Sequence, residues 1–198
     1  MVFIGITILL ASLCATFILL SLFAPHRAPV AAIDTTPTAP AVQGVSTPSI
    51  PSPPATIAIE KINVSAPVHP VGLTSAGDMD INDEAEQTAW YKFGPLPGEV
   101  GSAVIAGHYG WKDGVPSVFN DLNTLVKGDM VTVYDEKGLA KKFIVTRTAL
   151  YKPNQDATEV FISNDGKAHL NLITCQGSWN NSAQTYSERL IIFTDFVE

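Results

Sequence analysis

The sequence is poor in cysteine and in charged residues, and both shortages restrict its function. Its 198 residues include two cysteines, too few for a disulfide-stapled scaffold or a four-ligand zinc site. Charged residues make up 16% of the chain, and the net charge is −7 because acidic residues outnumber basic ones. A nucleic-acid-binding protein needs a basic face to neutralise phosphates, so this balance argues against nucleic acid as a partner.

The chain begins with a long apolar run. Val2 to Ala24 contains no charged residue and no proline. A helix of this length rises roughly 34 Å, enough to cross the ~30 Å hydrocarbon core of a bilayer. Cleaved secretory signals have a basic start and a shorter apolar core. We therefore predict an uncleaved transmembrane anchor in residues 1–24, in contact with the membrane through residues 2–24. The nearest cation, Arg27, follows the run and gives no support for an outside orientation.

Two unlike pieces follow the anchor. Residues 25–55 are rich in Pro, Thr and Ala, with seven prolines between positions 28 and 55, and have no hydrophobic period. Such a segment cannot bury a core and is predicted to be a partly extended tether. Residues 56–198 can bury a core, and the whole net negative charge lies in this part.

The hydrophobic pattern of residues 56–198 is mostly of period two, which is typical of β-strands. One segment, Val118 to Val126, has apolar residues at helical spacing and is predicted to be a short helix. Many short strands and few helices indicate a β-sandwich or a closed barrel. The predicted strands are Ile57–Ile62, Ala103–Ala106, Met130–Tyr134, Lys142–Val145, His169–Thr174 and Arg189–Phe193.

Three residues at the ends of predicted strands have side chains suited to nucleophilic catalysis. Cys175 follows a predicted strand, His108 ends the apolar segment Ser102–His108, and Arg189 stands at the entry to the last strand. A thiolate attacks carbonyls, an imidazole exchanges protons with a thiol and a leaving amine, and a guanidinium donates to an oxyanion. Taken singly, each residue has a plainer interpretation, and Cys175 alone reads as a small buried hydrophobe.

The surrounding motifs resemble the sortases, the Cys transpeptidases of bacterial surfaces. The strand Leu172–Cys175 with Gly177 is similar to their active-site strand, although Asn171 stands where Thr is commonest. The segment ending at His108 resembles their histidine segment, and Arg189 falls where the family carries its Arg. The resemblance covers nearly all of residues 56–198, and features such as the Cys-Gln-Gly triplet bring it closest to classes E/F and D.

The resemblance implies a closed β-barrel of about eight strands with one or two short helices, behind an N-terminal transmembrane helix. It implies cleavage of an LPXTG-like sorting signal between Thr and Gly through a thioester on Cys175, and transfer to an amine. His108 would be the general acid, Arg189 the oxyanion or substrate clamp, and Thr174 a substrate-binding neighbour. No cofactor or metal is expected. The domain would lie outside the cytoplasm at the cell membrane, attaching surface proteins to the cell wall.

Several alternatives stay open from the sequence. The amine acceptor is either a lipid II cross-bridge or a pilin Lys. Other exported thiol enzymes use Cys and His, although the "SHGC"-like block of L,D-transpeptidases is absent. A non-enzymatic, membrane-tethered barrel with an inert, buried Cys175 is the remaining reading. Asp156, Glu159 and Asp165 are read as solvated loop charges rather than calcium ligands, and His169 as too far along its strand to act as the base.

Overall fold

The computed structural model describes residues 51–112 and 114–197. The anchor predicted in residues 1–24 and all but the last residues of the predicted tether at 25–55 lie outside this part of the chain. Within it, no helix has both the length and the apolar character needed to cross a bilayer.

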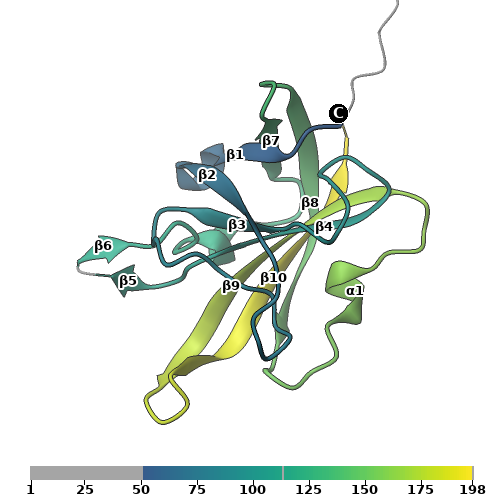
Figure 1. The fold of residues 1–198 in the computed structure, drawn as a ribbon. Coiled ribbons are helices and arrows are strands. Elements are labelled where there is room, and N and C mark those ends of the chain that lie inside the picture. Colours follow the sequence, from purple (N-terminus) through teal and green to yellow (C-terminus); the bar gives the residue numbers. More distant parts are fainter. Residues whose placement is uncertain (1–50, 113, 198) are drawn as a thin grey trace, which may run out of the picture. The chain divides into compact units, whose positions relative to one another are not determined.

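Eight strands close into a barrel in the order β1-β2-β3-β4-β9-β10-β8-β7, which confirms the predicted closed barrel (Figure 1). Neighbours pair antiparallel except β2 with β3 and β4 with β9, which are parallel. A separate two-stranded sheet joins β5 (Trp111–Lys112) to β6 (Val115–Pro116). The barrel strands are β1 (Pro54–Ile59), β2 (Val64–Val71), β3 (Thr88–Tyr91), β4 (Gly101–Gly107), β7 (Met130–Asp135), β8 (Ala140–Tyr151), β9 (Ala168–Asn180) and β10 (Thr185–Phe196).

Apolar side chains of β10 point alternately into the barrel and toward a second apolar cluster outside it. Leu190 and Ile192 belong to the main core inside the barrel. Ile191 and Phe193, one residue out of phase, pack outside it with Tyr151 and Val160. Successive side chains of a strand point to opposite faces, so this outer face also receives the residues of β10 and β9 that share their phase.

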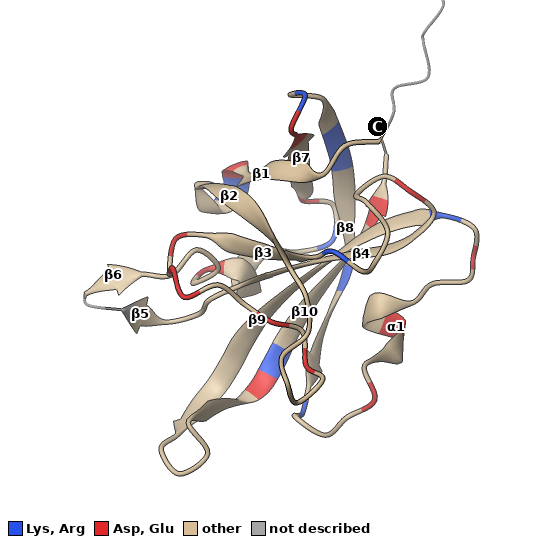
Figure 2. Cartoon of the chain, in the orientation of Figure 1, with Lys and Arg blue, Asp and Glu red and all other residues tan. Residues whose placement is uncertain are grey.

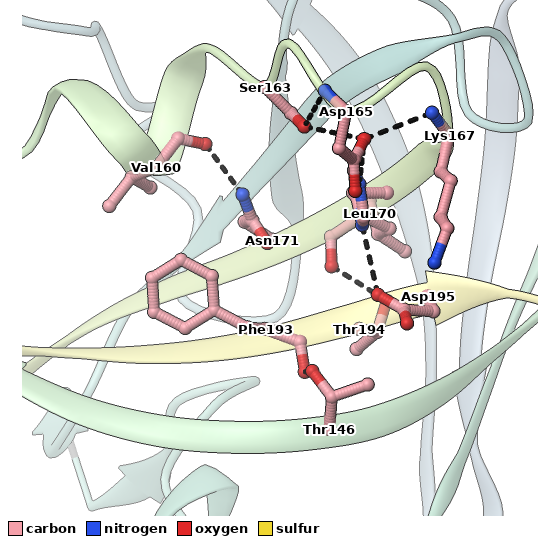
Figure 3. Close-up of polar contacts among 11 residues, drawn as sticks. Thr146, Val160, Ser163, Asp165, Lys167, Leu170, Asn171, Phe193, Thr194 and Asp195 are labelled. Atoms are coloured by element: carbon pink, nitrogen blue, oxygen red, sulfur yellow. Dashed lines mark hydrogen bonds and ion pairs between the residues drawn. The ribbon is translucent and has the colours of Figure 1, made fainter.

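A short helix covers this outer face. α1 (Thr158–Phe161) lies in the β8–β9 connection and buries Val160 completely. Asn171 of β9 is buried and donates from Nδ2 to the Val160 carbonyl over 2.6 Å (Figure 3). The Asn that replaces the commonest Thr of the family strand therefore fixes α1 against the barrel. Sequence pattern gave no signal for α1, which is only four residues long.

Two predicted elements need correction. The helix predicted over Val118–Val126 is wrong: its only regular turn is the 3-10 helix η2 (Leu122–Thr124). The backbone N–H groups of Leu122, Thr124 and Leu125 each donate to the carbonyl three residues earlier, and the backbone is extended at Leu125. This is the 3-10 pattern, and it stops before an α-helical turn can form. The strand predicted over Ile57–Ile62 ends at Ile59, because Glu60–Ile62 forms the 3-10 helix η1, closed by a left-handed Asn63.

Candidate active site

Cys175 and Arg189 face each other across β9 and β10. Their Cα positions are direct partners in the antiparallel register. Cys175 shares the phase of Ile173 along β9, and Arg189 shares that of Ile191 along β10. The pair therefore continues the outer apolar face, away from the barrel interior.

A bulge just beyond Cys175 sets this pairing. The register steps by one residue between Tyr186 and Glu188, so that Gly177 and its neighbour on β9 both oppose Ser187. Gly177 has a φ of +85°, a left-handed conformation that favours glycine, and a Cβ here would collide with the Ser187 hydroxyl. The glycine of the Cys-Gln-Gly triplet is thus required by the backbone of the site.

His108 reaches the same region from the end of β4. Because β4 and β9 run parallel with Ala106 opposite Ile173, the residue that follows β4 comes level with Cys175. Gly107 precedes the histidine, and a Cβ on it would lie 2.5 Å from the Phe119 ring. His108 Nε2 lies 2.7 Å from the backbone carbonyl of Asn82. A carbonyl only accepts, so we assign the Nε2 proton to this bond and leave Nδ1 to gain or lose a proton.

One cavity of about 500 Å³ brings the three residues together, because His108, Cys175 and Arg189 all line it. Its apolar wall is formed by the outer cluster under α1, and a second wall by Asp78 to Ile81 of the β2–β3 loop. The arrangement combines a nucleophile, an acid–base group and a cation beside an apolar groove, which suits acyl transfer.

The electrostatics of the cavity keep the thiol neutral. Burial raises the pKa of Cys175 above its usual value of 9.0, and the positive charge of Arg189 lowers it part of the way back. The thiolate is therefore a minority form at neutral pH, although the guanidinium favours it.

Arg189 is held by the hairpin that carries it. Nη1 donates to the backbone carbonyls of Tyr186 and Glu188, at 3.2 and 3.1 Å, and Nη2 donates to the Thr185 hydroxyl at 2.9 Å. The planar group is thus fixed in orientation at the cavity wall, which a flexible ammonium would not be.

The sortase-domain family matches residues 57–197, which is most of the chain. The chain belongs to the sortase family. No curated protein sequence matches it significantly.

Solved sortase structures resemble the fold. Sortase C-1 from Actinomyces oris has 27% identity and a TM-score of 0.58, covering 72% of this chain and 73% of that one. Sortase A from Corynebacterium diphtheriae has 22% identity and a TM-score of 0.56, covering 76% and 63%. The sortase D5 transpeptidase from Clostridium perfringens has 21% identity and a TM-score of 0.54, covering 74% and 79%. The last two likenesses concern the fold alone, and the assignment to classes E/F or D stays a prediction.

Thr174 has a structural partner in this sortase. Its side chain is buried, and its hydroxyl donates to the Gly107 carbonyl over 2.8 Å. The bond joins the residue before Cys175 on β9 to the residue before His108. The hydroxyl is therefore engaged away from substrate, and the predicted substrate-binding role stays a prediction that concerns the backbone of Thr174.

Sequence reasoning missed the β2–β3 loop. Asn82 orients His108, and Asp78 to Ile81 line the cavity, yet residues 72–87 carry no motif beyond a run of acidic side chains. The acidic run was the available signal. Its contact with the site depends on long-range packing, which a local pattern does not record.

The remaining candidates lie apart from the cavity. Among residues 51–112 and 114–197 no cluster of three or more His, Cys, Asp or Glu has a metal-binding arrangement. The three carboxylates weighed above as calcium ligands have separate partners. Asp156 accepts from Thr158, and Glu159 of α1 accepts from Arg147. Asp165 accepts from Ser163 (Figure 3).

His169 bridges two carboxylates at the far end of β9. Its Nδ1 lies 2.9 Å from Asp195 and its Nε2 3.0 Å from Asp165. Burial lowers the pKa of His169, but the hydrogen bonds and charges of the two carboxylates raise it by more, so it lies above the usual 6.5. This is a stabilising ion-pair cluster near the start of β9, remote from Cys175 along the strand.

Proposed function

We propose that this sortase is a cysteine transpeptidase that cleaves an LPXTG-like sorting signal between Thr and Gly and transfers the acyl fragment to an amine. The observation that carries the proposal is the cavity shared by His108, Cys175 and Arg189. Membership of the sortase family supports it. The apolar outer cluster beside Cys175 provides a surface for the apolar residue of such a signal.

The first half-reaction would form a thioester. The Sγ of Cys175, as thiolate, attacks the Thr carbonyl carbon while protonated His108 lies alongside. The S–C bond forms, the C–N bond breaks, and the departing Gly nitrogen takes the proton from His108. Arg189 faces the oxyanion of the tetrahedral intermediate that precedes C–N cleavage. A fixed hydrogen-bond donor in a cavity stabilises such an oxyanion more than water does.

The second half-reaction would reverse these roles. The acceptor nitrogen attacks the thioester carbonyl, the C–S bond breaks, and the amine proton passes to His108 as the thiolate leaves. The acceptor is a lipid II cross-bridge or a pilin Lys, and the product is a surface protein attached to the cell wall. We further propose that residues 2–24 anchor the enzyme in the cell membrane, with residues 25–55 as a tether and residues 56–198 as the catalytic domain outside the cytoplasm.

Product analysis tests this proposal. The full-length chain, in a mild detergent, is mixed with an LPXTG peptide and triglycine amide, and the products are weighed. A peptide cut after Thr and joined to triglycine is expected, and Cys175→Ala should give none. Cys14→Ser is the matched control and should remain active. Absence of any joined product across a library of sorting motifs would contradict the proposal.

Protection of Cys175 from alkylation by a bound peptide separates the enzyme from an inert barrel. Because burial raises the Cys175 pKa against the opposing charge of Arg189, alkylation should be slow at pH 7 and should accelerate above pH 9. In an enzyme, a bound sorting peptide should protect the thiol. In an inert barrel, the peptide would have no effect on the rate.

A further inference from the structure

His108 borders a second cavity besides the one that contains Cys175. This second cavity, of about 240 Å³, is lined by Asp83, Ala85, His108, Tyr109, Trp111 and Ser117. We propose that it binds the primary ammonium group of the acceptor, and we name it the acceptor cavity. The inference rests on the proposed function, which requires an amine as second substrate.

The location follows from the two roles of His108. The imidazole that protonates the departing amine must also deprotonate the incoming one, because the second half-reaction retraces the first. A bound ammonium group first releases one proton to solvent, and the neutral amine then gives its second proton to His108 as the C–N bond forms. The acceptor nitrogen therefore has to reach His108 while the acyl fragment still fills the cavity at Cys175. The acceptor cavity opens onto His108 without including Cys175, so it offers a route that the thioester does not block.

The walls have the chemistry that an ammonium group selects. Asp83 supplies a carboxylate, and the rings of Tyr109 and Trp111 supply π faces that attract cations. The Trp111 side chain is 69% exposed, so its ring is open to a ligand that arrives from solvent. The Ser117 hydroxyl adds a polar group at the inner wall.

The β2–β3 loop extends this negative potential. Residues 72–87 carry five acidic side chains and no Lys or Arg, and Figure 2 shows red and no blue along this loop. Asp78 and Asp80 border the cavity at Cys175, and Asp83 borders the acceptor cavity. A field of one sign at a cleft raises the local concentration of an oppositely charged substrate, here a cation.

The acceptor cavity is preformed by backbone hydrogen bonds between its walls. The N–H of Ser117 donates to Gly110 and that of Phe119 to His108, while Val118 donates to Ala85, all over 2.8 to 3.0 Å. The Tyr109 ring also stacks edge-on against Tyr186 of β10 at 5.3 Å. Walls fixed in this way spare a ligand the entropic cost of ordering them.

Acceptor kinetics test the assignment. With saturating sorting peptide, Asp83→Asn and Trp111→Ala should each raise the KM for amine about twofold to fivefold, the size of one exposed cation contact. This effect should exceed any change in the rate of thioester formation. Glu136→Gln and Leu139→Ala are the matched controls, since both side chains are exposed, lie between β7 and β8, and line neither cavity. Triglycine amide and Nα-acetyl-lysine amide, used in parallel, show whether an α-amine or an ε-amine binds better.

Amine binding can also be measured directly, by NMR, in a chain that does not turn over. The described tryptophans include the buried Trp90 and the exposed Trp111 and Trp179, so their indole N–H signals can be assigned by substitution. In the Cys175→Ala chain, added triglycine amide or acetyl-lysine amide should shift the Trp111 signal and leave Trp90 unmoved. If that signal stays still and neither variant changes the KM beyond the controls, the assignment is overturned. If the wild-type chain forms no thioester but the Trp111 signal shifts, the proposed function fails and the ammonium site stands.

Discussion

Replacing Thr174 by Val tests whether one buried hydroxyl holds the two halves of the site together. The Thr174 side chain is 2% exposed, and its hydroxyl donates to the Gly107 carbonyl over 2.8 Å. Val keeps the shape and removes the donor. Losing such a buried bond costs about 1–3 kcal/mol of the free energy of unfolding. For a domain of this size, that lowers the Tm by about 2–12 °C.

The same substitution should also slow the chemistry. Gly107 precedes His108 and Thr174 precedes Cys175, so a relaxed β4–β9 contact changes the distance between imidazole and thiol. A misplacement of about 1 Å costs on the order of a hundredfold in rate, so thioester formation should slow by about tenfold to a hundredfold. The fall should appear in kcat, with the KM for the sorting peptide nearly unchanged.

A second buried threonine provides the control. Thr194 is 1% exposed and donates to the Leu170 carbonyl over 2.7 Å, between β10 and β9 at the end remote from Cys175 (Figure 3). Thr194→Val should therefore lower the Tm by a similar amount and leave kcat close to wild type. Thr174→Ser should recover most of the activity. Equal kcat in the two Val variants, measured by peptide turnover and thermal unfolding, would refute the positioning role.

The remaining predictions concern three other residues. The pKa of His169 is raised in the folded state. Protonated His169 therefore stabilises the fold below pH 6.5, and this stabilisation is lost as the pH rises through the folded-state pKa. The Tm, measured from pH 5 to 9, should fall across that window, and it should fall less in His169→Gln. Gly177→Ala forces a side chain into a left-handed conformation and against Ser187, so it should lower the free energy of unfolding by at least about 1 kcal/mol. Arg189→Lys keeps the charge beside Cys175 and loses the planar fork, so kcat should fall about tenfold to a hundredfold in peptide turnover.

Each of these has a result that would count against it. A Tm profile of His169→Gln that matches wild type from pH 5 to 9 would remove the ion-pair cluster from the account. Ser187→Gly should restore part of the stability lost in Gly177→Ala, and no recovery would mean that the collision is not the cause. Full activity in Arg189→Lys would show that charge alone suffices at that position.

The sequence predicted the barrel because its strands alternate strongly. Runs such as Leu170–Ile173 and Leu190–Phe193 combine β-branched and apolar residues with clear turn signals, and the structure contains both strands. The same pattern placed Cys175, His108 and Arg189 at strand ends, and this is correct only for His108, which follows β4. It is wrong for the other two, because β9 continues past Cys175 to Asn180 and β10 begins at Thr185, before Arg189. The β9–β10 hairpin is longer than the apolar runs alone indicate, and the parallel pairing of β4 with β9 brings His108 level with Cys175. Their catalytic roles stay predictions.

Other features depended on contacts that a local pattern does not contain. The apolar spacing around Phe119 and Leu122 suited a helix, but these side chains enter the barrel core from a turn and a short 3-10 helix. Asn82 and α1 reach the site only through tertiary packing. Asn171 looked like a minor departure from the family strand, yet it is buried and anchors α1.

Intact mass of the enzyme after brief exposure to a sorting peptide tests the central claim most directly. The account predicts an adduct equal to the acyl fragment ending in Thr, located by peptide mapping on Cys175 and not on Cys14, and removed by hydroxylamine as the Thr-hydroxamate. The adduct should be absent in Cys175→Ala. Turnover of the peptide by Cys175→Ala at the wild-type rate, or an adduct on any other residue, would contradict the account.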